Sequence, residues 1–164
     1  DVGGEERFHF DFAGKFFEES EKEYFDNYVK EKKLEEYITY HGIVGGEEKK
    51  ELLKKCYIFA LPTRYPNEGQ PISILEAMGN GMFIITTDHA GIPDIVEAGV
   101  NGIVIDVSKI DVQKVYQKLL NMTQEIFLLI VKENREKVYQ HYTQRYYIQN
   151  MGKTMQEILN GMDS

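Results

Sequence analysis

The chain has 164 residues, a formal net charge of −8 and one cysteine, Cys56. This acidic balance argues against nucleic-acid binding, because a phosphate backbone demands a basic face. One cysteine excludes an intramolecular disulfide, and the four scattered histidines lack neighbouring ligands for a zinc site. The length suffices for one core and no Pro-, Gly- or Ser-rich linker divides the sequence, so we expect a single domain over residues 1–164.

Apolar runs alternate with helical patterns from the amino terminus onward. The predicted strands are Phe8 to Ala13, Tyr37 to His41, Tyr57 to Leu61, Phe83 to Thr87 and Ile103 to Ile105. The predicted helices between them are Glu18 to Lys33, Glu47 to Cys56, Ile72 to Asn80 and a short turn of helix after Gly91-Ile92-Pro93. This alternation is typical of a parallel sheet that helices cover on both faces.

Beyond Asp111 the pattern changes to successive amphipathic helices, the last of which is predicted over Arg145 to Leu159. No apolar run approaches the roughly 20 residues of a membrane span. The sequence therefore predicts an α/β three-layer domain with a mostly parallel sheet of about five strands and a helical carboxyl-terminal tail.

Two glutamates eight positions apart, Glu68 and Glu76, bracket the passage from the third predicted strand into a helix. Open α/β sheets bind ligands beyond the carboxyl ends of their strands, where a helix amino terminus offers N–H groups and a positive dipole end to phosphate. Pro71 suits the first helical turn, since its missing N–H has no helical partner there. Paired glutamates are also typical of solvated or capping groups, so their spacing alone leaves both interpretations open.

The wider sequence favours the binding site. The run NEGQPISILEAMGNG resembles the E-x7-E element of retaining glycosyltransferases of family 4 (group 1), which have the GT-B architecture. The similarity extends from about Phe8 to about Tyr147 through FDFAGK, YITYHGIV, IFALPT and FIITTDHAGIPDIVEAGVNGIVI. It implies a Rossmann-like domain that forms the carboxyl-terminal, donor-binding half of a two-domain enzyme.

The resemblance also implies a reaction and a set of site residues. The reaction is transfer of a sugar from a nucleotide-diphosphate sugar to a glycan or lipid-linked acceptor in cell-surface polysaccharide biosynthesis, without an obligatory metal or other cofactor. Glu68 matches the first glutamate of the element, a catalytic contact to the donor sugar, and Glu76 matches the second, which binds the ribose hydroxyls. The further implied donor-binding residues are Gly14, Lys15, Gly42, Ile43, Gly69, Gln70, Pro71, Ile72 and Ser73.

The chain departs from the family pattern at its amino terminus. Family members open this domain with a strand and helix carrying a Gly-Arg and a downstream Lys, which are understood to hold the donor diphosphate. Residues 1–7 are instead an acidic lead-in, so the first predicted strand corresponds to the family's second. We therefore interpret the chain as a piece of a larger enzyme, expected to be inactive alone, whose acceptor-binding domain is elsewhere. The strands beside the absent central one are expected to pair directly, leave a gap or recruit another segment.

The loop from Glu68 to Pro71, which faces the donor phosphate in the family, also departs from the family pattern. The family usually has Glu-Gly-Phe-Gly, whereas Gln70 and Pro71 take the last two places here, and proline removes one N–H donor. A non-catalytic nucleotide-binding or interaction module therefore stays as the alternative function. For Arg64 we favour a surface residue over a phosphate contact, and for His89 we favour a turn residue over a catalytic acid or base. The expected location is the cytoplasm, with peripheral contact to the inner face of the membrane left open for the longer parent protein.

Overall fold

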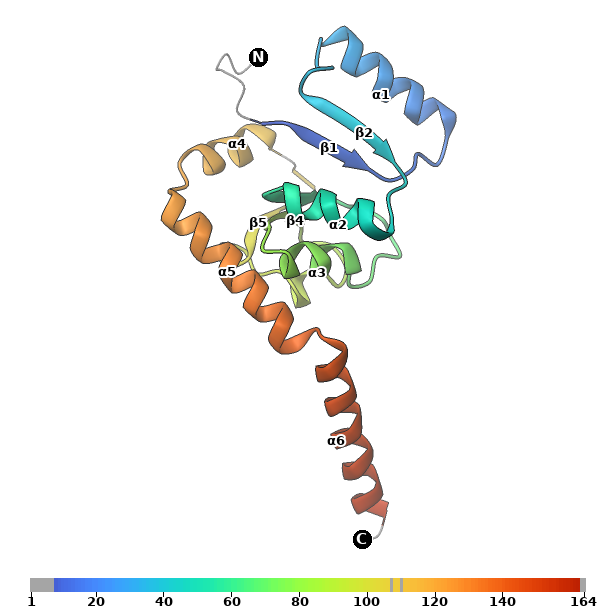
Figure 1. Ribbon diagram of the computed structural model, residues 1–164, viewed down its shortest axis with the longest axis vertical. Helices are drawn as coiled ribbons and strands as arrows, with labels where there is room; N and C mark the ends of the chain where they lie inside the picture. The colour runs from blue at the N-terminus through green and yellow to red at the C-terminus, as the bar shows by residue number, and fades with distance from the viewer. Residues whose placement is uncertain (1–7, 107, 110, 163–164) are drawn as a thin grey trace. The chain divides into compact units, whose positions relative to one another are not determined.

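The computed structural model describes residues 8–106, 108–109 and 111–162, and the chain divides into two compact units, Asp1–Leu52 and Leu53–Ser164. The acidic lead-in of residues 1–7 lies outside the described residues. Each unit has its own parallel sheet (Figure 1).

In the first unit, β1 (Phe10–Ala13) and β2 (Ile38–Gly42) pair in parallel, and α1 (Glu19–Glu31) connects them. A capping box between Glu18 and Glu21 begins α1, because each side chain accepts a backbone N–H that the first turn leaves unpaired. Aromatic side chains pack α1 onto the strands, with ring centroids of Phe12 and Phe25 5.3 Å apart. In the sequence, α2 (Gly46–Lys55) spans the boundary between the units.

The second unit contains the three parallel strands β3 (Ile58–Leu61), β4 (Phe83–Thr87) and β5 (Gly102–Ile105), with β4 in the centre. All five residues of β4 are buried. The remaining elements of this unit are α3 (Ile72–Gly79), the 3-10 helix η1 (Ile92–Asp94), α4 (Val112–Leu120), α5 (Gln124–His141) and α6 (Gln144–Met162).

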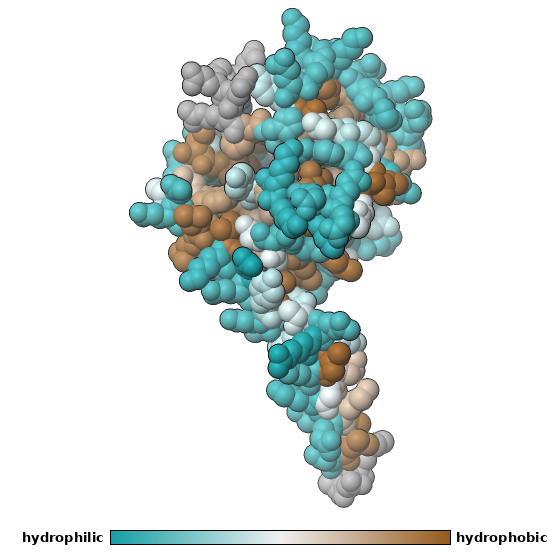
Figure 2. Space-filling view, viewed as in Figure 1, coloured by the Kyte–Doolittle hydropathy of each residue, from teal (hydrophilic) through white to brown (hydrophobic). Residues whose placement is uncertain are grey.

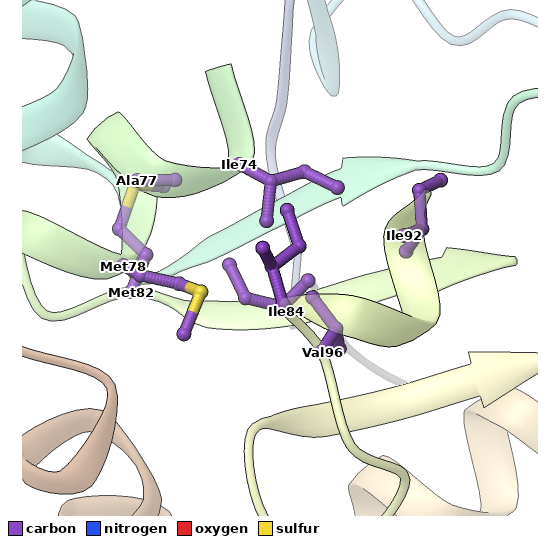
Figure 3. Close-up of a cluster of buried hydrophobic side chains, with 8 residues drawn as sticks. Ile74, Ala77, Met78, Met82, Ile84, Ile92 and Val96 are labelled. Carbon is purple, nitrogen blue, oxygen red and sulfur yellow. The ribbon is translucent and has the colours of Figure 1, made fainter. Parts of the chain in front are cut away.

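The two faces of β4 belong to different apolar clusters. On one face Ile84 packs with Ile74, Ala77 and Met78 of α3 and with Ile92 of η1 (Figure 3). On the other face Phe83 and Ile85 pack with Ile103 of β5 and Ile130 of α5. Alternate side chains of a strand point to opposite faces, so a central strand between helical layers is buried along its whole length.

A buried polar network ties α5 to this core. The Asn134 side chain donates to the carbonyls of Met82 at 2.8 Å and Asn101 at 2.9 Å, and its oxygen accepts from the Asn101 amide at 2.9 Å. Lys137 Nζ donates to the Ile95 carbonyl at 2.9 Å and to Asn101 Oδ1 at 3.3 Å. Each buried polar atom of Asn134 therefore has a partner, as a dry site requires.

The last helix is different in character. Nearly all described side chains of α6 are exposed or half-buried, and large apolar ones such as Tyr147, Ile148 and Met155 are among the exposed. Figure 2 shows hydrophobic side chains along one side of α6 and hydrophilic ones along the other. This separation confirms the amphipathic pattern of the sequence.

The α/β class, the five parallel strands and the helical tail are confirmed, with element bounds close to those predicted. The strands lie in two sheets instead of one. Of the outcomes expected for the two strands beside the absent central one, direct pairing does not occur, since β1 and β3 are not hydrogen-bonded to each other in the described chain. The short apolar run Tyr57 to Leu61 predicts a buried strand, and this prediction was wrong: Tyr57 is 77% exposed and β3 is only half-buried. The physical reason is that β3 is an edge strand of its sheet. The single domain over residues 1–164 stays a prediction.

The Asn134 network predicts a large loss of stability on substitution. Asn134→Leu should lower the free energy of unfolding by about 2–5 kcal/mol, because it leaves the Met82 carbonyl and the Asn101 side-chain amide buried without partners and leaves the Asn101 carbonyl only its bond from the Ile84 N–H. Urea denaturation measures this, with Asn160→Leu at an exposed helical position as the matched control. Equal stability of the two variants would contradict the role of the network.

Candidate active site

Two loops leave the carboxyl edge of the β3-β4-β5 sheet next to each other. One runs from the end of β3 at Leu61 to the start of α3 and carries Glu68; the other runs from the end of β4 at Thr87 to η1 and carries His89. The strands are parallel neighbours, so both loops begin at the same edge. This is the edge at which open α/β sheets bind ligands.

The first turn of α3 is open to an anion. Pro71 is the N-cap residue and so lies just before the first helical turn, in which it was predicted. No side chain caps the helix. The Ile74 N–H donates to the Pro71 carbonyl at 3.0 Å, whereas the N–H groups of Ile72 and Ser73 have no acceptor within the described chain. Ile72 is 72% exposed. Unpaired N–H groups and the positive helix end together favour a bound negative charge.

The two predicted glutamates lie on either side of this turn in the sequence, and both are half-buried. The Glu68 N–H donates to the Tyr65 carbonyl at 3.1 Å, which closes a turn before Gly69. Glu76 is in the second turn of α3, as predicted. Seven predicted site residues thus follow β3 within a single loop and helix: Glu68, Gly69, Gln70, Pro71, Ile72, Ser73 and Glu76.

Two threonine side chains of β4 hold the start of the loop that follows β3. The Thr86 hydroxyl donates to the Leu61 carbonyl at 2.9 Å, and the Thr87 hydroxyl donates to the Thr63 carbonyl at 2.7 Å. Both threonines are completely buried. Sequence reasoning missed these two residues, although a pair of hydroxyls that ends an otherwise apolar strand was a signal for them.

The other four predicted residues lie together in the first unit. Gly14 and Lys15 follow β1, Gly42 ends β2 and Ile43 comes after it. The Gly14 N–H donates to the Gly42 carbonyl at 2.7 Å, and both glycines have positive φ, +143° and +68°, which favours glycine. Lys15 Nζ lies 5.6 Å from the centre of the Phe17 ring, and Ile43 is 76% exposed.

The remaining polar groups add little to the site. Arg64 is exposed, in agreement with its interpretation as a surface residue. At the end of β5, hydrogen bonds from the hydroxyl and the N–H of Ser108 hold the pKa of the Asp106 carboxyl below its usual value. No group of three or more His, Cys, Asp or Glu within the described residues is placed to hold a metal ion.

Comparison with curated proteins gives two similarities. The chain is 28% identical over 137 residues to the putative colanic acid biosynthesis glycosyltransferase WcaL of Salmonella typhimurium, covering 79% of the chain and 33% of WcaL. It is 33% identical over 73 residues to the amylovoran biosynthesis glycosyltransferase AmsK of Erwinia amylovora, covering 42% of the chain and 18% of AmsK. The chain thus spans about a third of the length of WcaL.

Solved structures show the fold. Anabaena HepE in complex with UDP has a TM-score of 0.79 at 19% identity, over 92% of the chain and 41% of HepE. The carboxyl-terminal domain of the group 1 glycosyl transferase LpcC from Francisella tularensis has a TM-score of 0.63 at 20% identity, over 77% of the chain and 64% of that domain. The fold is that of GT-B glycosyltransferases.

The family model for glycosyl transferases group 1 matches residues 4–125. This match covers well over half of the sequence and includes both glutamates and the loops after β3 and β4. The chain therefore belongs to the glycosyl transferases group 1 family.

Proposed function

We propose that this chain is the donor-binding part of a retaining glycosyltransferase that moves a sugar from a nucleotide-diphosphate sugar to a glycan or lipid-linked acceptor. The observation that carries the proposal is the continuity of the Glu68 loop with the uncapped first turn of α3, in a chain of the group 1 family. One segment thereby offers a carboxylate and an anion site to the same ligand.

The comparisons support the substrate class. HepE has been solved with UDP and with UDP-glucose, so a uridine diphosphate sugar is the first donor to test. The names of WcaL and AmsK refer to colanic acid and amylovoran biosynthesis, which supports a role in polysaccharide biosynthesis. The acceptor would be bound by parts of the natural protein outside this chain, and we propose that the 164 residues alone transfer no sugar.

The chemistry assigns a role to each group. Cleavage of the anomeric C–O bond places negative charge on the diphosphate and positive charge on the sugar ring. The N–H groups of Ile72 and Ser73 and the dipole of α3 would stabilise the diphosphate. The Glu68 carboxylate would act beside the sugar ring, and Glu76 would accept hydrogen bonds from the ribose hydroxyls.

Pro71 limits the number of N–H groups that face the phosphate. As the N-cap residue it supplies none, so Ile72 is the first donor of the helix. A non-catalytic nucleotide-binding module with the same fold would tolerate this loss equally well. Measured transfer separates the two functions, because the non-catalytic module binds donor without turning it over.

We propose a cytoplasmic enzyme. In the part of the chain that the structure describes, no helix has both the length and the apolar character to cross a bilayer. A lipid-linked acceptor would bring the natural protein to the inner face of the membrane.

The two glutamates should differ in their kinetic effect. In the natural protein that contains this chain, Glu76→Ala should raise the donor KM about 10-fold or more with a smaller change in kcat, because a ribose contact acts alike in the ground and transition states. Glu68→Ala should instead lower kcat by about 10²-fold, since a charge beside the ring acts in the transition state. Steady-state kinetics with UDP-glucose checks both, and Glu133→Ala on the exposed side of α5 is the control. Unchanged kinetics in both variants would remove the proposed roles.

The reaction should retain the configuration of the donor and need no metal. An α-linked donor should give an α-linked product, which the coupling constant of the anomeric proton reports during the first turnovers. The rate should stay within about 2-fold when EDTA is added, because backbone N–H groups and a helix dipole take the place of a cation. A β-linked product contradicts the retaining mechanism, and loss of activity that Mg²⁺ restores contradicts metal independence.

A further inference from the structure

His89 makes a contact across the active-site edge that its interpretation as a turn residue leaves unexplained. Its Nε2 donates to the Tyr65 backbone carbonyl at 2.8 Å, 24 positions earlier in the chain. A carbonyl oxygen only accepts, so Nε2 carries the hydrogen in this contact. A role as general base through Nε2 would require this hydrogen bond to break, which argues against that role.

The Tyr65 carbonyl is also the acceptor of the Glu68 N–H at 3.1 Å. One oxygen therefore joins the imidazole of His89 to the backbone of the proposed catalytic glutamate. Few other contacts hold this segment: the Tyr65 N–H donates to the Thr63 hydroxyl at 3.1 Å, residues 64–67 are all exposed, and the Tyr65 side chain is 54% exposed. Without apolar burial, the path of the segment depends on its few polar contacts.

The contacts form a series. The carbonyls of Leu61, Thr63 and Tyr65, at alternate positions, accept from Thr86, Thr87 and His89 in turn. The first two contacts are made by buried threonine side chains at the end of β4, and the third is the last of the series before Glu68. Loss of the third contact therefore frees the turn and leaves the strand ends in place.

His89 is itself anchored to the core. The Ile92 N–H donates to the His89 carbonyl at 3.1 Å, and Ile92 is completely buried against α3 and β4. Gly91 lies directly against the same loop: a Cβ at this position would be 2.8 Å from the Gly69 oxygen. Only a residue without a side chain permits this approach, so the loop after β4 fits the loop after β3 closely.

We propose that His89 is a positioning residue that holds the turn of residues 65–68, and with it Glu68, in place for sugar transfer; the proposal rests on the proposed function. His89 contacts neither donor nor acceptor in this role. It acts through the Tyr65 carbonyl, and Gly91 makes room for the following residues of the loop.

Two variants of His89 in the natural protein test the proposal. His89→Ala removes the donor and should lower kcat about 3–10-fold with a donor KM within about 2-fold, the size of one lost hydrogen bond. His89→Gln places an amide N–H close to the position of Nε2 and should restore most of the rate. His141→Ala, an exposed histidine at the end of α5, is the matched control. The same loss of kcat in His89→Gln and His89→Ala would overturn the proposal.

The link to Glu68 has its own test. In a Glu68→Gln background, His89→Ala should lower kcat by less than about 2-fold, because the group that it positions is already disabled. An undiminished effect would show that His89 acts by another route and would overturn the proposal.

Amide hydrogen exchange gives a readout that needs no activity. His89→Ala should speed exchange at the Glu68 amide about 3–10-fold and leave the amides of β4 protected. His89→Gln should leave exchange at the Glu68 amide unchanged. Unchanged exchange at Glu68 in His89→Ala overturns the positioning role. Absence of transfer by the unmodified protein, with the exchange effect present, instead overturns the proposed function. The two failures are therefore distinguishable.

Discussion

The parallel pairing of β3 with β4 is the constraint on which the rest of the active site depends. Backbone pairing runs from Ile58 opposite Phe83 to Leu61 opposite Thr86 and then ends. Beyond that point side chains replace the backbone as donors, first the threonine hydroxyls and then the imidazole. The register of the strands therefore fixes where each carbonyl of the following loop lies. A slip by one residue would move each hydroxyl away from the carbonyl that it now contacts and exchange the two faces of the strand.

The same strand positions the anion site. With only eight residues, α3 is too short to be stable by itself, so its place comes from packing. Ile74, Ala77 and Met78 are completely buried against Ile84 and η1 (Figure 3). Each large apolar side chain buried in this way contributes about 1.5–3 kcal/mol. The Asn134 network, Ile130 and Val138 hold α5 against both apolar clusters, so β4 and α3 are fixed together and the first turn of α3 is held at the carboxyl edge.

Periodicity predicted what depends on local pattern. The bounds of β4 agree with prediction because its run of large apolar residues is buried on both faces, and α3 agrees because small and apolar residues recur at helical spacing. The half-exposed state of β3 was not predictable, since an edge strand and a central strand have similar composition in a short apolar run. The contacts of His89 and Asn134 were not predictable either, because they join positions 24 and 52 apart and depend on the tertiary fold. The division into two sheets likewise depends on pairing that no local pattern encodes.

A crystal structure of the natural protein with a bound uridine diphosphate sugar tests the central claim most directly. The claim is that the segment from Glu68 to Glu76 binds the donor, with the diphosphate on the first turn of α3. We predict a phosphate oxygen at about 2.7–3.2 Å from the N–H of Ile72 or Ser73, with the Glu68 carboxylate on the sugar side. A diphosphate that contacts neither N–H group, or a donor bound away from the carboxyl edge of β3 and β4, would contradict the account.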